Sequence, residues 1–143
     1  MKRHLSVTLL VGALALAASP VLGQSFADIQ GKWTFSKKTD RFGDATQTIE
    51  FKDNGFTYRV TAKDGTTLLY AKGKAAVEKL GPFKIIKLTS IEGGDSEANT
   101  QAVDDDRTLV YTGEGEQLTL ALNFDHSRDG EEAECNTYHK VNK

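Results

Sequence analysis

The stretch QTIEFKDNGFTYRVTA, residues 47–62, decides the fold class because it carries two alternating runs around one turn signal. Apolar and polar side chains alternate before and after the central pair Asn54-Gly55. A period of two is typical of a strand buried on one face, and an Asn-Gly pair tolerates the positive φ angles of a tight hairpin turn. The stretch therefore predicts an antiparallel β-hairpin.

The same alternation recurs outward from this hairpin in both directions. Trp33 and Phe35 alternate with polar residues before it, and leucines alternate over residues 118–122 near the other end. Residues 74–80 contain good helix formers, so the sequence leaves open whether they form a turn of helix or extend the fourth strand. The eight strands that we expect cover residues 31–36, 46–53, 56–63, 66–73, 83–91, 107–113, 117–124 and 133–141.

Eight short antiparallel strands remove their exposed edges most simply by closing into a barrel. We therefore expect an all-β protein, a small antiparallel up-and-down β-barrel of about eight strands, with a β-sandwich as the alternative. A barrel of this size is either filled by side chains or holds one small ligand, and the sequence leaves both open. The large side chains that would face its interior are Trp33, Phe35, Phe51, Phe56, Tyr58, Leu120 and Phe124.

The first 23 of the 143 residues have the character of a cleaved signal peptide. Residues 2–4 are basic, and residues 5–18 form an apolar run that is too short to span a bilayer, which needs about 20 residues. We expect residues 1–23 to be removed and residues 24–143 to form a single domain. The sequence thus predicts an exported protein, either periplasmic or extracellular.

The charge of the chain excludes some partners. Loss of residues 1–23 removes two of the 18 basic residues and none of the 20 acidic ones, which leaves a mildly acidic domain. Nucleic acid and anionic membranes attract a continuous basic stripe, and the densest one here is Lys37-Lys38 with Arg41 nearby. We expect no nucleic-acid partner and no membrane insertion after signal cleavage.

The segment FADIQGKW, residues 26–33, resembles the opening of lipocalins and related calycin barrels. In that family a short 3₁₀ turn closes one barrel end and a Gly-x-Trp motif, here Gly31 and Trp33, starts the first strand. The family's tryptophan packs across the closed end, often against a cation near the last strand, and Lys140 is the counterpart that the resemblance suggests. The family's Thr-Asp-Tyr-like loop, disulfide and C-terminal helix are missing, and residues 104–107 (DDDR) stand in the place of the loop.

The sequence offers no residues that would make an enzyme. Cys135 and His139 share a face of the last expected strand, but four strand residues span about 13 Å, which is too far for a catalytic pair or one metal ion. Residues 125–130 (DHSRDG) match the first half of an EF-hand loop, but position twelve is Asn136 instead of glutamate. We expect a hydrophilic hairpin loop there, no catalytic residue, no cofactor and no metal site.

Two further features are expected to be structural. Cys135 is the only cysteine, so it forms no disulfide within the chain, and its strand position favours a small buried residue. The acidic run at residues 104–106 favours a solvated turn.

The resemblance implies a non-enzymatic binding protein whose barrel holds a small hydrophobic or amphipathic ligand. The candidate ligand-binding residues are Phe51, Tyr58, Leu120 and Phe124. The alternative is an exported protein partner, because small exported barrels that begin with Gly-x-Trp also resemble bacterial metalloprotease inhibitors, whose inserted tail would correspond to residues 24–27. An envelope structural protein with no soluble ligand is the third hypothesis, and the sequence favours no oligomeric state.

Overall fold

The structure is a computed structural model. The residues that it describes are 25–40, 42–124, 130 and 132–142. The predicted signal peptide at residues 1–23 lies outside them, as does most of the candidate calcium loop at residues 125–130. Within the described residues, no helix has the length and apolar character that crossing a bilayer would require.

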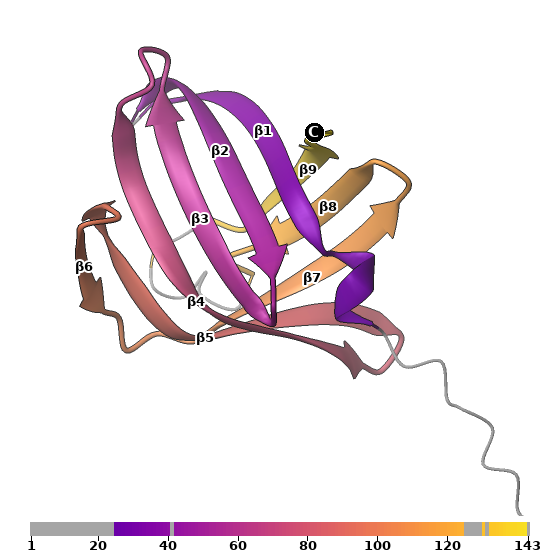
Figure 1. Cartoon of the computed structure of the whole chain (residues 1–143). Helices are drawn as coiled ribbons and strands as arrows, with labels where there is room; N and C mark the ends of the chain where they lie inside the picture. The colour runs from indigo at the N-terminus through magenta and orange to yellow at the C-terminus, as the bar shows by residue number, and fades with distance from the viewer. Residues whose placement is uncertain (1–24, 41, 125–129, 131, 143) are drawn as a thin grey trace, which may run out of the picture.

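One short 3₁₀ helix and nine strands make up the described fold (Figure 1). Every strand pairing is antiparallel, and all strands except β6 close into an up-and-down barrel in the order β1-β2-β3-β4-β5-β7-β8-β9, with β9 returning to β1. The predicted barrel is confirmed, and the alternative of a β-sandwich is wrong. The elements are η1 (Phe26–Asp28), β1 (Gly31–Thr39), β2 (Gly43–Lys52), β3 (Gly55–Ala62), β4 (Thr67–Leu80), β5 (Phe83–Ser96), β6 (Asn99–Ala102), β7 (Arg107–Glu114), β8 (Gln117–Leu122) and β9 (Glu134–Lys140).

The hairpin predicted at residues 47–62 is formed by β2 and β3, with Phe51 opposite Phe56. Its two turn residues are Asp53 and Asn54, whose φ angles are 51° and 59°. Two positive φ angles in succession match the twist of a tight hairpin, and Asp and Asn adopt them more readily than other residues with a side chain. The glycine of the expected Asn-Gly turn, Gly55, instead begins β3.

Residues 74–80 extend β4, which settles the choice between helix and strand. They pair with β5 up to the last pair, Leu80 opposite Phe83, across a turn in which Gly81 has a φ of 59°. Pairing with the neighbouring strand therefore outweighs the helix propensity of this segment.

A bulge in β4 bends the wall of the barrel. A Cβ atom on Gly73 would lie 2.7 Å from the carbonyl oxygen of Thr89, so only glycine allows this close approach. Ser90, on the facing strand, has a φ of 52°. β5 pairs with β7 before this bend and with β6 beyond it. Neither β6 nor the extension of β5 to residue 96 was predicted from the sequence.

The end of the barrel covered by η1, here called the closed end, is tightly packed. Trp33 is buried there, and its indole Nε1 donates a hydrogen bond to the carbonyl oxygen of Ile29 at 2.8 Å. The ammonium of Lys140 lies 5.3 Å from the centre of the indole ring. The cation that the resemblance suggested therefore stacks on Trp33, a contact that stabilises the closure.

The seam between β1 and β9 closes the barrel with few pairs. The strand ladder contains only Trp33 opposite Lys140 and Thr34 opposite His139 among the described residues. A hydrogen bond of 2.8 Å from the amide of Val141 to the carbonyl of Lys32 continues it. The seam thus joins the beginning and the end of the domain through a short stretch next to Trp33.

Two side chains expected inside the protein lie at its surface. β8 ends at Leu122, and Asn123 has a φ of 59°, which interrupts the alternation and leaves Phe124 39% exposed. The expectation that Cys135 is buried is also wrong, because its neighbour Asn136 takes the inward position on β9 and turns the thiol outward.

Candidate functional site

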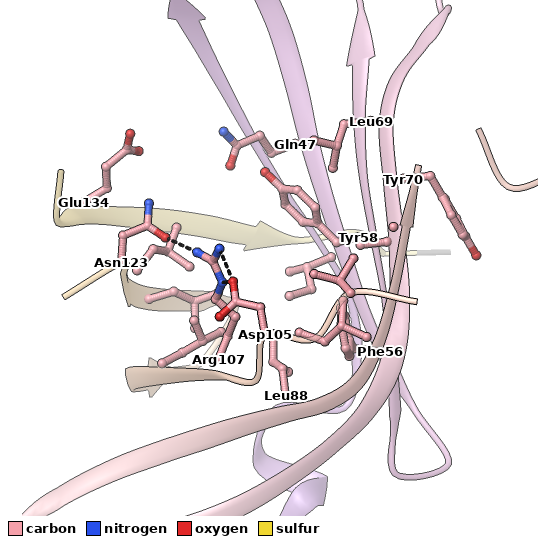
Figure 2. Close-up of a pocket in the computed structure, with 18 of the residues that line it drawn as sticks. Gln47, Phe56, Tyr58, Leu69, Tyr70, Leu88, Asp105, Arg107, Asn123 and Glu134 are labelled. Atoms are coloured by element: carbon pink, nitrogen blue, oxygen red, sulfur yellow. Dashed lines mark hydrogen bonds and ion pairs between the residues drawn. The ribbon is translucent and has the colours of Figure 1, made fainter. Parts of the chain in front are cut away.

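The barrel interior is partly hollow. A cavity of about 560 Å³ lies within the described part of the barrel, in the range of about 300–1,000 Å³ typical of small-molecule sites (Figure 2). The described residues that line it come from every barrel strand except β1 and from the loop after β6. The residues that line it include Gln47, Ile49, Phe56, Tyr58, Tyr70, Ala71, Leu88, Asp105, Arg107, Leu109, Leu120, Asn123, Glu134 and Tyr138.

Buried apolar side chains form one part of this lining, here called the apolar floor. Its members are Ile49, Phe56, Leu88, Leu109 and Leu120, from five different strands. Each lies on the inward side of its strand, where the alternation of the sequence places it. The floor continues into the closed-end core, because the same five residues belong to the buried cluster that contains Trp33.

An arginine reaches into the cavity from the start of β7 (Figure 2). Its Nη2 and Nε atoms donate to one carboxylate oxygen of Asp105 at 2.7 and 3.0 Å, and its Nη1 donates to the side-chain oxygen of Asn123 at 3.0 Å. Arg107 and Asp105 are both less than one-third exposed, so this charge-assisted contact is partly shielded from water. Residues 104–106 were expected to form a solvated turn. Asp104 and Asp106 are exposed, but Asp105 lines the cavity and binds Arg107.

A second polar group lies on β9 and β2. The hydroxyl of Tyr138 donates to the side-chain oxygen of Gln47 at 2.8 Å. The carboxylate of Glu134 accepts from the side-chain amide of Asn136 at 3.1 Å and lies 3.5 Å from the ammonium of Lys37. These contacts hold the polar side chains of the cavity in place and balance the charge of Glu134.

Two tyrosines that line the cavity near Glu134, Tyr58 and Tyr138, remain protonated well above neutral pH. Burial raises the pKa of Tyr58 to about 12, and the negative charge of Glu134 adds to the effect. Burial also raises the pKa of Tyr138, with smaller contributions from Tyr58 and Glu134. Both phenols are therefore neutral hydrogen-bond donors at physiological pH.

The cavity contains two of the four ligand-binding residues predicted from the sequence. Tyr58 and Leu120 line it. Phe51 lies instead in the closed-end core, in an edge-to-face contact with Phe26 at 6.4 Å between ring centres. Phe124 follows β8 at the surface and is not among the described lining residues.

Sequence reasoning missed the polar half of the cavity. Gln47 shares its strand face with Ile49, and Arg107 shares its strand face with Leu109, so each belongs to an inward stripe of its own strand. A polar residue in line with an apolar stripe was the available signal. Tyr70, in contrast, contributes to the wall but turns its ring away from the cavity (Figure 2), and Arg59 lies over that ring at 5.4 Å.

The described residues do not form a metal centre. No three His, Cys, Asp or Glu side chains gather within the described ranges where they could hold an ion. His139 is exposed on β9, while His126 and the central residues of the candidate calcium loop lie outside the described residues. The side chain at position twelve of that loop, Asn136, points into the barrel and binds Glu134.

The overall architecture is compatible with the lipocalin-like barrel that the Gly31-x-Trp33 opening resembles. A short 3₁₀ helix precedes the first strand, a tryptophan packs across the closed end, and a cation from the last strand covers it. Comparison of the chain with protein-family models, with curated proteins and with solved structures found no match.

Proposed function

We propose that this chain is an exported, non-enzymatic binding protein of the lipocalin-like, calycin type, and that it holds a small amphipathic ligand inside its barrel. The observation that carries the proposal is the cavity of about 560 Å³, whose lining combines an apolar floor with a few fixed polar groups. Sites of this composition bind by burying an apolar body and orienting it through one or two polar contacts.

The charges around the cavity favour a ligand whose polar end is neutral. Arg107 is held by Asp105, and Glu134 lies beside Lys37, so each charge has an opposite partner within the protein. A ligand carboxylate would have to compete with Asp105 for the guanidinium. A hydroxyl, carbonyl or amide needs only a neutral donor or acceptor, which Tyr58 provides at the cavity wall.

Mass spectrometry of the exported protein tests the proposal directly. We expect a native mass larger than the denatured mass, with the difference equal to one small molecule. We also expect a neutral amphiphile, such as a long-chain alcohol or monoacylglycerol, to compete for the site better than a fatty acid of the same length. A bare native mass, together with no uptake of any of these probes, would refute the proposal and favour the envelope structural protein.

A pair of variants on β4 tests whether the ligand binds in the cavity. Ala71 lines the cavity, whereas Ala76 is exposed on the same strand. Ala71→Phe should fill the cavity and reduce ligand binding at least tenfold while the barrel stays folded, and Ala76→Phe should leave binding unchanged. Equal binding by both variants would place the ligand elsewhere.

The protease-inhibitor alternative has less support from the contacts of the tail. Phe26 packs against Phe51 in the closed-end core, and Ser25 caps η1 by accepting a hydrogen bond from the amide of Ala27 at 3.1 Å. Residues engaged in this way would have to leave the barrel before they could enter another protein. Removal of the tail separates the hypotheses when the fluorescence of Trp33 shows that the barrel stays folded, because inhibition depends on the tail and no residue that lines the cavity is removed.

A further inference from the structure

The tip of the β4–β5 hairpin, Lys79–Lys84, extends beyond both neighbouring strands and is called the ribbon tip here. In the described chain, the ladder from β3 to β4 ends at Lys74, and the ladder from β5 to β7 begins at Ile85. The ribbon tip is therefore a two-stranded projection that no third strand supports, and Figure 1 shows it passing beneath η1.

The ribbon tip carries an exposed apolar pair. Leu80 and Phe83 lie directly opposite each other and are 58% and 56% exposed, more than any other large hydrophobic side chain of the described residues. The chain places them next to a tight Gly81-Pro82 turn, where polar residues would serve the turn equally well. More than half of each side chain stays exposed after folding, so the pair gains less from burial in water than a covered pair would.

Two lysines, one before Leu80 and one after Phe83, point to the opposite face of the ribbon, because successive residues of a strand alternate between its faces. Lys79 is opposite Lys84, an arrangement of like charges that destabilises a hairpin. Glu78 is the nearest acid in this hairpin, and it is bound to Lys87 at 2.9 Å. The ribbon tip is thus both apolar and positively charged, although the chain as a whole has a net charge of −2.

Both features are unfavourable in water, and both become favourable at the surface of an anionic lipid bilayer. If the ribbon tip enters end-on, Leu80 and Phe83 would reach the boundary between headgroups and acyl chains. The exposed Lys79 would carry its ammonium group to the lipid phosphates, and Lys84 would do so after leaving the ring of Tyr111. Lysines close to such a surface are attracted by its negative potential. We infer that the ribbon tip docks this protein on anionic lipid bilayers.

This docking is peripheral and differs from the membrane contacts considered in the sequence. No continuous basic segment exists, because the two lysines are brought together only by the hairpin register. The acidic turn between β7 and β8, which holds Glu114 and Glu116, lies on the other side of η1 from the ribbon tip in Figure 1. The ribbon tip can therefore contact a bilayer while the carboxylates of this turn stay away from the lipid surface.

Co-sedimentation with lipid vesicles tests this inference. The exported protein is used, with its mass measured to verify that residues 1–23, whose apolar run would bind lipid by itself, are absent. We expect binding to vesicles of phosphatidylcholine mixed with phosphatidylglycerol, much weaker binding to phosphatidylcholine alone, and a loss of binding at raised salt. Absence of binding to the anionic vesicles would overturn the inference and leave a protein partner as the occupant of the ribbon tip.

Matched variants locate the contact. Leu80→Ser with Phe83→Ser should reduce binding at least about tenfold, because most of the inserted apolar surface is lost. Each of Lys79→Gln and Lys84→Gln should reduce binding to anionic vesicles about fivefold. The control is Phe124→Ser, an exposed aromatic away from the ribbon tip.

All these side chains except Lys84 are exposed, and Lys84 is half-buried with its ammonium 5.9 Å from the ring centre of Tyr111. Far-UV circular dichroism and the fluorescence of the single tryptophan check that each variant is folded. If the folded double serine variant bound as well as the parent protein, the ribbon tip would not be the contact.

Discussion

Leu118 and Leu120 lie two residues apart on β8 and are both fully buried, yet only Leu120 lines the cavity. Leu118 faces Gly113 and Tyr138 in its two ladders, within the closed-end core. Replacement of each leucine by alanine removes the same atoms from the same strand. The difference between the two costs therefore reports whether the space beside Leu120 is hollow.

The expected magnitudes follow from the two contributions to a core truncation. Loss of three buried carbons costs about 2.4 kcal/mol in transfer free energy at ~0.8 kcal/mol each. At Leu118 the surrounding core adds the cost of a new cavity, which brings the total to about 4 kcal/mol, within the range seen for buried leucines. At Leu120 the change enlarges a space that already exists, so we expect a cost close to the transfer contribution alone, about 2.5 kcal/mol.

Urea unfolding followed by the fluorescence of Trp33 measures both costs. Trp33 is the only tryptophan of the chain and is buried at the closed end, so it reports the loss of the core in either variant. Equal costs for Leu118→Ala and Leu120→Ala, with unchanged dependence on urea, would show that Leu120 is packed on all sides. That result would refute the hollow barrel and with it the basis for ligand binding.

Three further predictions concern the closure, the buried phenol and the bulge. Lys140→Met should lower the free energy of unfolding by about 0.5–1 kcal/mol in urea titrations, because the charge over Trp33 is lost, and Lys140→Arg should restore it. The stability that the protonated Tyr58 contributes is complete below pH 10 and is lost as the pH rises toward 12, because the unfolded chain releases its proton first. We compare the free energy of unfolding of Tyr58→Phe with that of the parent protein at neutral pH and at high pH. Between neutral pH and pH 12 this difference should shift by about 2 kcal/mol in favour of the variant, and an unchanged difference would contradict this. Gly73→Ala should cost about 1–3 kcal/mol in thermal unfolding, because its Cβ would collide with the Thr89 carbonyl, whereas Gly113→Ala, with no atom closer than 3.9 Å, should change stability by less than about 0.5 kcal/mol.

The alternation in the sequence was sufficient to predict the eight strands of the barrel and, for most of them, the face that they bury. It placed Trp33, Phe56, Tyr58 and Leu120 inside the barrel, and all four side chains lie there. It failed where the chain leaves regular strand geometry, as at Asn123, whose left-handed backbone turns the following phenylalanine outward.

The position of a side chain along the barrel axis could not be predicted in the same way. Phe51 and Tyr58 are both inward residues of one hairpin, but Phe51 belongs to the closed-end core and Tyr58 to the cavity. Periodicity distinguishes the two faces of a strand and contains no information on depth. Depth depends on where η1 and Trp33 cap the barrel, and the register that fixes this point involves β9, far away in the sequence.

β6 could not be predicted for a related reason. Its four residues, Asn99–Ala102, have no apolar alternation, and the close approach of the strand to β5 depends on Gly94, where a Cβ atom would collide with the backbone of Asn99. From the sequence, Arg107 was likewise predicted only to lie where the loop at residues 104–107 meets the start of a strand. Its role in the cavity depends on Asp105 and Asn123, which the fold brings together from either side of β7 and β8.

From the short seam between β1 and β9 we expect this pairing to form last during folding. Hairpins such as β2–β3 form between neighbours, whereas the pair Trp33–Lys140 joins opposite ends of the domain and must overcome the largest loss of chain entropy. Until β9 arrives, the chain is an open sheet with two free edges and an exposed apolar face, the state most prone to aggregate. We therefore expect the docking of β9 to decide whether a newly made chain closes into the barrel or aggregates.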